Sequence, residues 1–229
     1  MAIRNFNADF LKHFDIGSFF QKEKKGGQKS VHFVDRGGIK QVMKLFDGGK
    51  DHRFNREMEI YNKYSALDGI PKIYDIYEYE GESLVFEEFI EGHTLSDIIV
   101  SYQSNNDSIV KLIKELFEIL TPIWNGRYVH RDIKPENIII KPDGKPVVID
   151  FGIARDLDSA SITGTGAQPG TWKWAAPEQY AGIKDMISYR TDFFSLGLIA
   201  YFLYHQKLPF GDTANDIDAK LKVMMKALV

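Results

Sequence analysis

Cysteine is absent from the 229-residue sequence, which excludes disulfide bonds, zinc sites built on thiolates and a cysteine nucleophile from this chain. The net charge is only −3 at pH 7, so no global positive field favours nucleic acid or an anionic membrane as the main partner. No uninterrupted apolar run of about 18 residues occurs, and the opening stretch MAIRNFNADFLKHF lacks the apolar core and cleavage site of a signal peptide. These absences lead us to expect a cytoplasmic chain with no membrane segment and no nucleic-acid partner.

The overall composition is that of a folded globular protein. Hydrophobic residues make up 44% of the sequence and charged residues 27%, which argues against a mainly disordered chain. The length fits one large domain or two small lobes that share a cleft. The sequence does not indicate an oligomeric state.

The first part of the chain is rich in predicted strands. Alternating or continuous apolar runs cover residues 30–35, 39–46, 73–80 and 83–89, and turn signals such as RGG, LDGIP and EGE separate them. Between the two groups of strands, Phe54, Met58 and Tyr61 define one apolar face of a helix. We therefore predict a small N-terminal lobe over residues 1–89.

The second part of the chain is predicted to be mainly helical. One amphipathic helix starts near residue 107, with Asp107 and Ser108 as the expected caps. A second, strongly apolar helix is expected to begin near Thr191. The apolar positions of the first helix follow the i, i+3, i+4 spacing: Ile109, Leu112, Ile113, Leu116, Phe117 and Leu120. The boundary between the two lobes is expected between Phe89 and Gly92, so residues 90–229 form the larger lobe. A strand-rich lobe followed by a helical lobe predicts the α+β fold class.

Charged and amide side chains interrupt the apolar sequence at two places that a hairpin would bring together. The stretch HRDIKPENIII contains Asp132, Lys134 and Asn137, and the strand VVID ends at Asp150. A carboxylate and an amide oxygen side by side suit Mg²⁺, which prefers oxygen ligands. Asp132 is then free to orient a hydroxyl nucleophile, and Lys134 can neutralise a phosphate in transfer.

Three motifs occur in the order found in eukaryotic-type (Hanks-type) protein kinases: HRDIKPEN, DFG and AAPE. The sequence resembles that family over almost its whole length. The resemblance implies a bilobal kinase fold, shortened at its C-terminal end, that uses ATP and Mg²⁺ to phosphorylate serine or threonine hydroxyls of proteins, including its own. It assigns Asp132 as the catalytic base, Asn137 and Asp150 as metal ligands, and Lys134 as a phosphate contact. Lys134 and the stretch GTWKWAAPE resemble the serine/threonine subgroup, in which Thr171 would help to position the base.

The same resemblance assigns a lysine and a glutamate in the N-terminal lobe. Lys44, at the end of QVMK, stands where the family holds the α and β phosphates of ATP. Glu57 is its expected ion-pair partner. The two residues are only 13 positions apart, a shorter spacing than the family leads us to expect, so Glu59 is an alternative partner.

The glycine-rich loop departs from the family pattern. Lys24, Gly26 and Lys29 occupy its three glycine positions, so only the middle glycine is kept. Gly26 and Gly27 still allow a turn, but fewer glycines weaken a cradle of backbone amides around phosphate. The lysines either compensate by charge or form a solvated hairpin tip.

Adenine is expected to bind between the lobes. The backbone groups of Glu88 to Ile90 would form hydrogen bonds with the base, and the residue at the back of the pocket would be Glu87 or, with a shift of one position, Phe86. Three residues stand at the positions where the family sandwiches the base: Val31, Val42 and Ile139.

Two features concern regulation. Arg131 resembles the arginine that binds a phosphorylated activation segment, and the loop between Gly152 and Ala176 offers candidate hydroxyls. Glu178 would normally pair with an arginine in a later helix. We expect that the sequence, which ends at Val229, does not reach that helix, which leaves the stability of the segment around Glu178 in doubt. The candidate hydroxyls are Ser159, Ser161, Thr163 and Thr165.

Two rival functions are open at this point. The eroded glycine loop is compatible with a pseudokinase that binds nucleotide as a scaffold or regulatory module. A small-molecule kinase of the aminoglycoside phosphotransferase type is the other, although those enzymes are not expected to carry all three motifs together.

Overall fold

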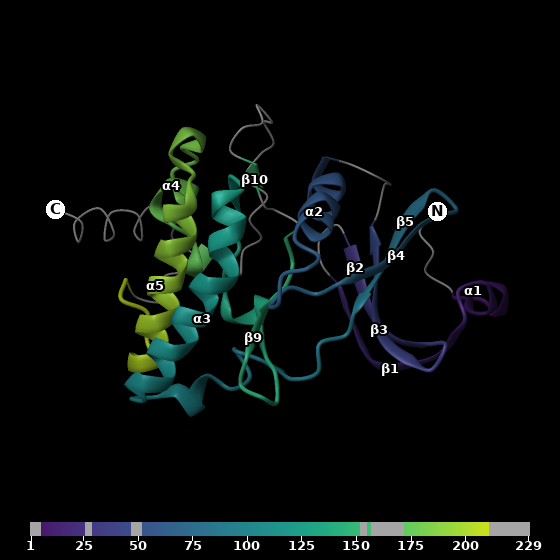
Figure 1. The fold of residues 1–229 in the computed structure, drawn as a ribbon, viewed down its shortest axis with the longest axis horizontal. Helices are drawn as coiled ribbons and strands as arrows, with labels where there is room; N and C mark the ends of the chain where they lie inside the picture. The colour runs from purple at the N-terminus through teal and green to yellow at the C-terminus, as the bar shows by residue number, and fades with distance from the viewer. Residues whose placement is uncertain (1–5, 26–28, 47–51, 152–154, 157–171, 211–229) are drawn as a thin grey trace. The chain divides into compact units, whose positions relative to one another are not determined.

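The computed structural model describes residues 6–25, 29–46, 52–151, 155–156 and 172–210 (Figure 1). The chain divides into two compact units. The first comprises Met1–Ala66 with Ile70–Ile90, and the second comprises Leu67–Gly69 with Glu91–Val229. A strand-rich unit and a mainly helical unit confirm the predicted α+β class.

The first unit is built on an antiparallel sheet that has five strands in the described residues. The strand order is β1-β2-β3-β5-β4. The predictions for β2 to β5 and for α2 are confirmed, whereas α1 and β1 were not predicted. The elements are α1 (Ala8–His13), β1 (Ile16–Lys25), β2 (Lys29–Arg36), β3 (Ile39–Phe46), α2 (His52–Lys63), β4 (Ile73–Tyr79) and β5 (Glu82–Glu88).

The two faces of this sheet differ in chemistry because side chains alternate along each strand. One face carries Met43 and Phe86, which are opposite each other on β3 and β5 and pack with Phe10 and Phe14, in and just after α1, in an apolar core. The opposite face carries Lys44, with Val31 across from it on β2. The sheet thus separates a hydrophobic cluster from a charged one.

The second unit contains two long helices that pack through aromatic rings. The Phe193 ring of α5 lies 4.8 Å from Phe117 and 4.7 Å from Trp124 of α3, measured between centroids. The helices of this unit are α3 (Asn106–Asn125), α4 (Pro177–Tyr180) and α5 (Tyr189–His205), and the short 3-10 helices are η1 (Ile99–Tyr102), η2 (Pro135–Asn137), η3 (Trp172–Trp174) and η4 (Lys184–Met186). The strands are β6 (His93–Thr94), β7 (Tyr128–Val129), β8 (Ile138–Ile140), β9 (Pro146–Val148) and β10 (Arg155–Asp156).

The predicted N-terminal caps of α3 were wrong by two to three residues. The cap is Asn105, whose side-chain oxygen accepts a hydrogen bond from the Ser108 N–H at 3.1 Å. Asp107 instead lies in the first turn, where its negative charge interacts favourably with the helix dipole. In the described ranges, no helix is long and apolar enough to cross a membrane.

Gly92 lies where the chain enters β6, and its conformation requires glycine. Its φ is +147°, and a Cβ placed there would come within 2.3 Å of the Ile140 carbonyl oxygen. That distance is shorter than any non-bonded carbon–oxygen contact, so a side chain at this position would push β6 away from β8.

Candidate active site

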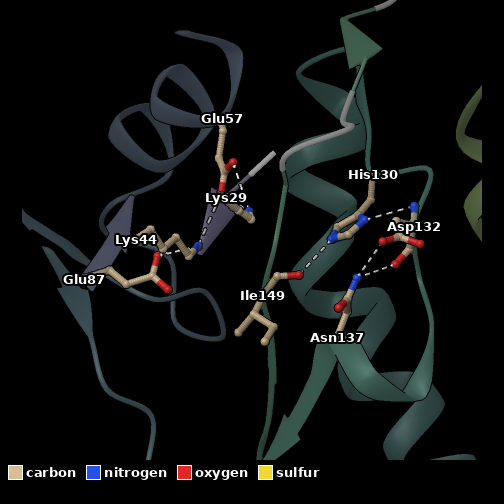
Figure 2. A network of polar contacts seen from close by, with 8 residues as sticks. All are labelled: Lys29, Lys44, Glu57, Glu87, His130, Asp132, Asn137 and Ile149. Carbon is tan, nitrogen blue, oxygen red and sulfur yellow. Dashed lines mark hydrogen bonds and ion pairs between the residues drawn. The ribbon is translucent and has the colours of Figure 1, made fainter. Parts of the chain in front are cut away.

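The charged face of the first unit centres on Lys44. Its Nζ lies 3.2 Å from Glu57 Oε1 and 2.8 Å from Glu87 Oε2 (Figure 2). All three side chains are at least 94% buried. The predicted ion pair between Lys44 and Glu57 is therefore present, and the alternative partner, Glu59, is exposed on α2.

Lys29 joins this network from β2. Its Nζ lies 3.4 Å from both carboxylate oxygens of Glu57. It stands at a glycine position of the expected phosphate loop, yet its ammonium is directed at α2 because Lys29 and Lys44 share one face of the sheet. The prediction of a solvated hairpin tip is therefore wrong for Lys29, whereas Lys24 is exposed. Gly26 and Gly27 lie outside the described residues.

The strand register places Glu87, and not Phe86, on the face of the sheet that carries Lys44; which of the two lies at the back of an adenine pocket stays a prediction. Val42 lies opposite Glu87 across β3 and β5, which places Glu87 on the same face as Lys44. Phe86 points to the other face, into the apolar core beneath α1. Glu87 therefore shares this face with Val85, which lies directly opposite Lys44.

Opposite charges meet in this network. The ammonium groups of Lys29 and Lys44 face the carboxyl group of Glu57, and Lys44 also faces that of Glu87. Burial raises the pKa of Glu87 above its ordinary value, and the Lys44 ammonium acts in the opposite direction. A buried carboxylate is costly unless it is paired, so the contact with Lys44 stabilises the charged form of Glu87.

The backbone of Glu88, predicted to bind adenine, is partly engaged. Its N–H donates to the Lys72 carbonyl at 2.8 Å, so this N–H is not an adenine donor. The role predicted for the backbone from Glu88 to Ile90 otherwise stays a prediction.

The second unit gathers the predicted catalytic residues in the loop after β7. Asp132 Oδ2 lies 2.8 Å from Lys134 Nζ and accepts a hydrogen bond from Asn137 Nδ2 at 3.0 Å (Figure 2). The same Nδ2 donates to the Asp132 carbonyl at 2.9 Å. Burial raises the pKa of the Asp132 carboxyl, while the Lys134 ammonium lowers it.

The hairpin of β8 and β9 brings the two predicted metal ligands to one end. Ile138 lies opposite Val148, and the Ile149 N–H donates to the Asn137 carbonyl at 2.9 Å. Asn137 uses its amide nitrogen to hold Asp132. Its amide oxygen accepts no hydrogen bond within the described ranges. Together with the carboxylate of Asp150 it provides the oxygen chemistry that Mg²⁺ prefers. Ile139, predicted to contact adenine, lies half-buried in β8.

A buried carboxylate of α5 accepts hydrogen bonds from the backbone of the catalytic loop. Asp192 of α5 accepts hydrogen bonds from the backbone N–H groups of His130, at 2.9 Å, and Arg131, at 2.8 Å. Its third donor is the indole Nε1 of Trp124 at 2.8 Å. Burial raises the pKa of Asp192, and these donors act in the opposite direction. Sequence reasoning identified the helix but missed Trp124, because no local pattern links residues 68 positions apart.

Gln179 attaches the segment after the activation loop to the catalytic loop. Its Nε2 donates to the Arg131 carbonyl at 2.8 Å, and its Oε1 accepts from the Ala176 N–H at 3.0 Å. Ser195 of α5 adds a hydrogen bond to the Trp174 carbonyl at 2.9 Å. Neither Gln179 nor Ser195 was singled out from the sequence, although Gln179 directly follows the AAPE motif.

Glu178 has a partner without a later arginine. Its Oε1 accepts a hydrogen bond from Thr191 Oγ1 at 2.6 Å. Thr191 Oγ1 also accepts from the Ser188 N–H at 3.2 Å, as part of the capping box of α5. The first turn of α5 thus stabilises the segment around Glu178, whose stability was in doubt from the sequence alone.

We expect Thr191→Val to lower the free energy of unfolding by about 1.5–3 kcal/mol, the range for hydrogen bonds to charged groups. The change preserves shape but removes the donor to Glu178 and the acceptor for the Ser188 N–H. Urea unfolding measures the effect. Thr121→Val is the matched control, since its exposed hydroxyl bonds only to the Phe117 carbonyl; equal unfolding midpoints for the two variants would contradict the prediction.

Several predicted residues lie outside the described residues. They are Thr171, the predicted partner of the catalytic base, and the candidate phosphorylation sites Ser159, Ser161, Thr163 and Thr165. Their roles stay predictions.

Residues 32–228 match the protein kinase domain family. Similar curated proteins include the probable serine/threonine-protein kinase PknB of Lactococcus lactis, which is 31% identical over 170 residues covering 73% of this chain and 27% of that protein. Serine/threonine-protein kinase PrkC of Bacillus subtilis is 30% identical over 208 residues, covering 85% and 31%. Serine/threonine-protein kinase PknA of a Nostoc species is 34% identical over 165 residues, covering 69% and 29%. The aligned regions amount to less than a third of the length of each of these relatives.

Proposed function

Because the chain belongs to the protein kinase domain family, we propose that it transfers the γ-phosphoryl group of ATP to serine and threonine hydroxyls of proteins. The observation that carries the proposal is the catalytic loop of the second unit. Asp132, Lys134 and Asn137 are held together there by contacts of 2.8–3.0 Å.

Asp132 acts on the hydroxyl nucleophile. Its Oδ2 is committed to Lys134 and Asn137, whereas its Oδ1 has no hydrogen-bond partner among the residues that the structure describes. This oxygen is buried in the structure, and we propose that a substrate hydroxyl that reaches it donates to it and is oriented for attack on the γ phosphorus. Lys134 then offsets the negative charge of the phosphoryl group being transferred.

ATP and Mg²⁺ are the cofactors that we assign to this site. Lys44 is proposed to hold the α and β phosphates, with Val31, Val42 and Ile139 lining the adenine site. The Asn137 amide oxygen and the Asp150 carboxylate would hold Mg²⁺, which neutralises charge on the phosphates when bound. Thr171, Gly26 and Gly27 keep their proposed roles in positioning the base and approaching the phosphates.

The choice of serine and threonine as acceptors is supported by Lys134 and by the names of the relatives. We propose that autophosphorylation within residues 159–165 is one of the reactions. We also propose that this domain is cytoplasmic and that its partners are proteins and not nucleic acids. The pseudokinase alternative gains no support, since Lys44, Asp132, Asn137 and Asp150 are all present.

The test is incubation of the purified chain with γ-labelled ATP, Mg²⁺ and a basic protein such as myelin basic protein. We expect label in the chain or the added protein, on phosphoserine and phosphothreonine and not on phosphotyrosine. Excess EDTA is expected to abolish the labelling because the phosphates lose their metal. Nucleotide binding with no labelling of either protein would favour the pseudokinase alternative.

A further inference from the structure

We propose that Glu87 is a second positioning residue for Lys44, so that two carboxylates from two different elements hold the ammonium group assigned to the ATP phosphates. The proposal rests on the proposed function and extends it. It gives a role to a buried acid that the catalytic assignments leave unused.

The geometry makes Glu87 the closer of the two carboxylates. The distance from Lys44 Nζ to Glu87 Oε2 is 2.8 Å, against 3.2 Å to Glu57 Oε1. Glu87 is on β5, which pairs directly with β3 along their length, so the sheet fixes the spacing between the backbones of Glu87 and Lys44. Glu57 is on α2, and its distance depends on how that helix packs.

The sharing of Glu57 between two lysines gives a second carboxylate a role. Glu57 is shared, because Lys29 Nζ lies 3.4 Å from both of its oxygens. Without Glu87, the ammonium group of Lys44 would compete with that of Lys29 for Glu57, and a buried ammonium that loses a carboxylate neighbour is costly in a site of low dielectric constant. Glu87 adds a carboxylate oxygen 2.8 Å from Lys44 Nζ.

The arrangement makes the position of Lys44 less dependent on α2. In a site with one carboxylate, displacement of that carboxylate releases the lysine. Here the cross-strand contact to Glu87 persists whether or not Glu57 is in place. Either carboxylate alone is therefore expected to keep Lys44 near its working position.

A double-mutant comparison tests this redundancy. We expect Glu57→Gln and Glu87→Gln each to raise the KM for MgATP by no more than about tenfold, with a smaller change in kcat. The double variant is expected to raise KM by more than the product of the two single effects, since Lys44 then loses both of these carboxylates. Glu78→Gln, an exposed acid on β4, is the matched control and should behave as the wild type. If Glu57→Gln is as severe as the double variant, Glu87 does not position Lys44.

Chemical labelling gives a readout that does not depend on catalysis. In the absence of nucleotide, acetylation of Lys44 by an amine-reactive reagent, followed by peptide mapping, is expected to be at least about threefold faster in Glu87→Gln than in the wild type. The reason is that a neighbouring carboxylate favours the unreactive ammonium form. Glu87→Asp, which keeps the carboxylate, should restore much of the protection, and a urea melt verifies that each variant folds. Unchanged labelling would overturn the proposal, even if the wild type proves inactive and the proposed function fails.

Discussion

Asp132→Asn is expected to lower the rate of phosphoryl transfer by roughly 10²–10⁴-fold, the range for loss of a general base. An amide at this position cannot take the hydroxyl proton, and it leaves the Lys134 ammonium without the carboxylate that now lies 2.8 Å away. Asn137 keeps its hydrogen bond to the backbone carbonyl of residue 132. The metal ligand therefore stays in place, and we expect the affinity for MgATP to be nearly unchanged.

Single-turnover measurement of transfer, together with calorimetric titration of MgATP, separates these two effects. Asp143→Asn provides the control, because Asp143 is an exposed acid in the turn between β8 and β9. A variant at Asp132 that keeps more than a tenth of wild-type transfer would exclude this residue as the base. A parallel loss of MgATP affinity would mean that the substitution had disturbed Asn137 as well.

Asp192→Ala is expected to lower the free energy of unfolding by about 3 kcal/mol or more. The carboxylate is fully buried and accepts from three N–H groups, those of His130, Arg131 and the Trp124 indole. Each buried donor left without an acceptor costs about 1–3 kcal/mol. Alanine supplies no acceptor, so the catalytic loop loses its attachment to α5.

Urea unfolding monitored by tryptophan fluorescence measures this change, since Trp124 reports directly on the site. The matched control is Asp185→Ala, at an exposed position in η4, which should shift the midpoint very little. Asp192→Asn is expected to fall between the two, because it keeps one acceptor oxygen. A midpoint for Asp192→Ala equal to that of the control would show that the three donors find other acceptors.

Local patterns were sufficient for much of the fold and for the identity of the catalytic loop. The strands β2 to β5 follow the apolar alternation, and α3 and α5 follow the helical period. The errors arose where a local signal was ambiguous. Asn105 was overlooked as a cap because Asp107 and Ser108 are equally good cap residues, and β1 was overlooked because its last residues, KEKK, resemble a solvated loop.

Contacts between distant residues could not be predicted in the same way. The pair of Lys44 and Glu87 depends on the register of β3 against β5, and a slip of one residue would have placed Phe86 beside the lysine instead. The pairing of Lys29 with Glu57 depends in turn on which face of β2 looks toward α2. Such contacts follow from three-dimensional packing, for which a single sequence contains no periodic signal.

Two residues of the candidate site adopt left-handed backbone conformations although neither is glycine: Arg131, with φ +69°, and Asp150, with φ +66°. Such a conformation costs on the order of 1 kcal/mol for a residue with a side chain. Glycine would relieve that cost at both positions, but it would also remove a proposed metal ligand at Asp150. The chain therefore keeps a side chain at two positions of the candidate site where the backbone alone would favour glycine.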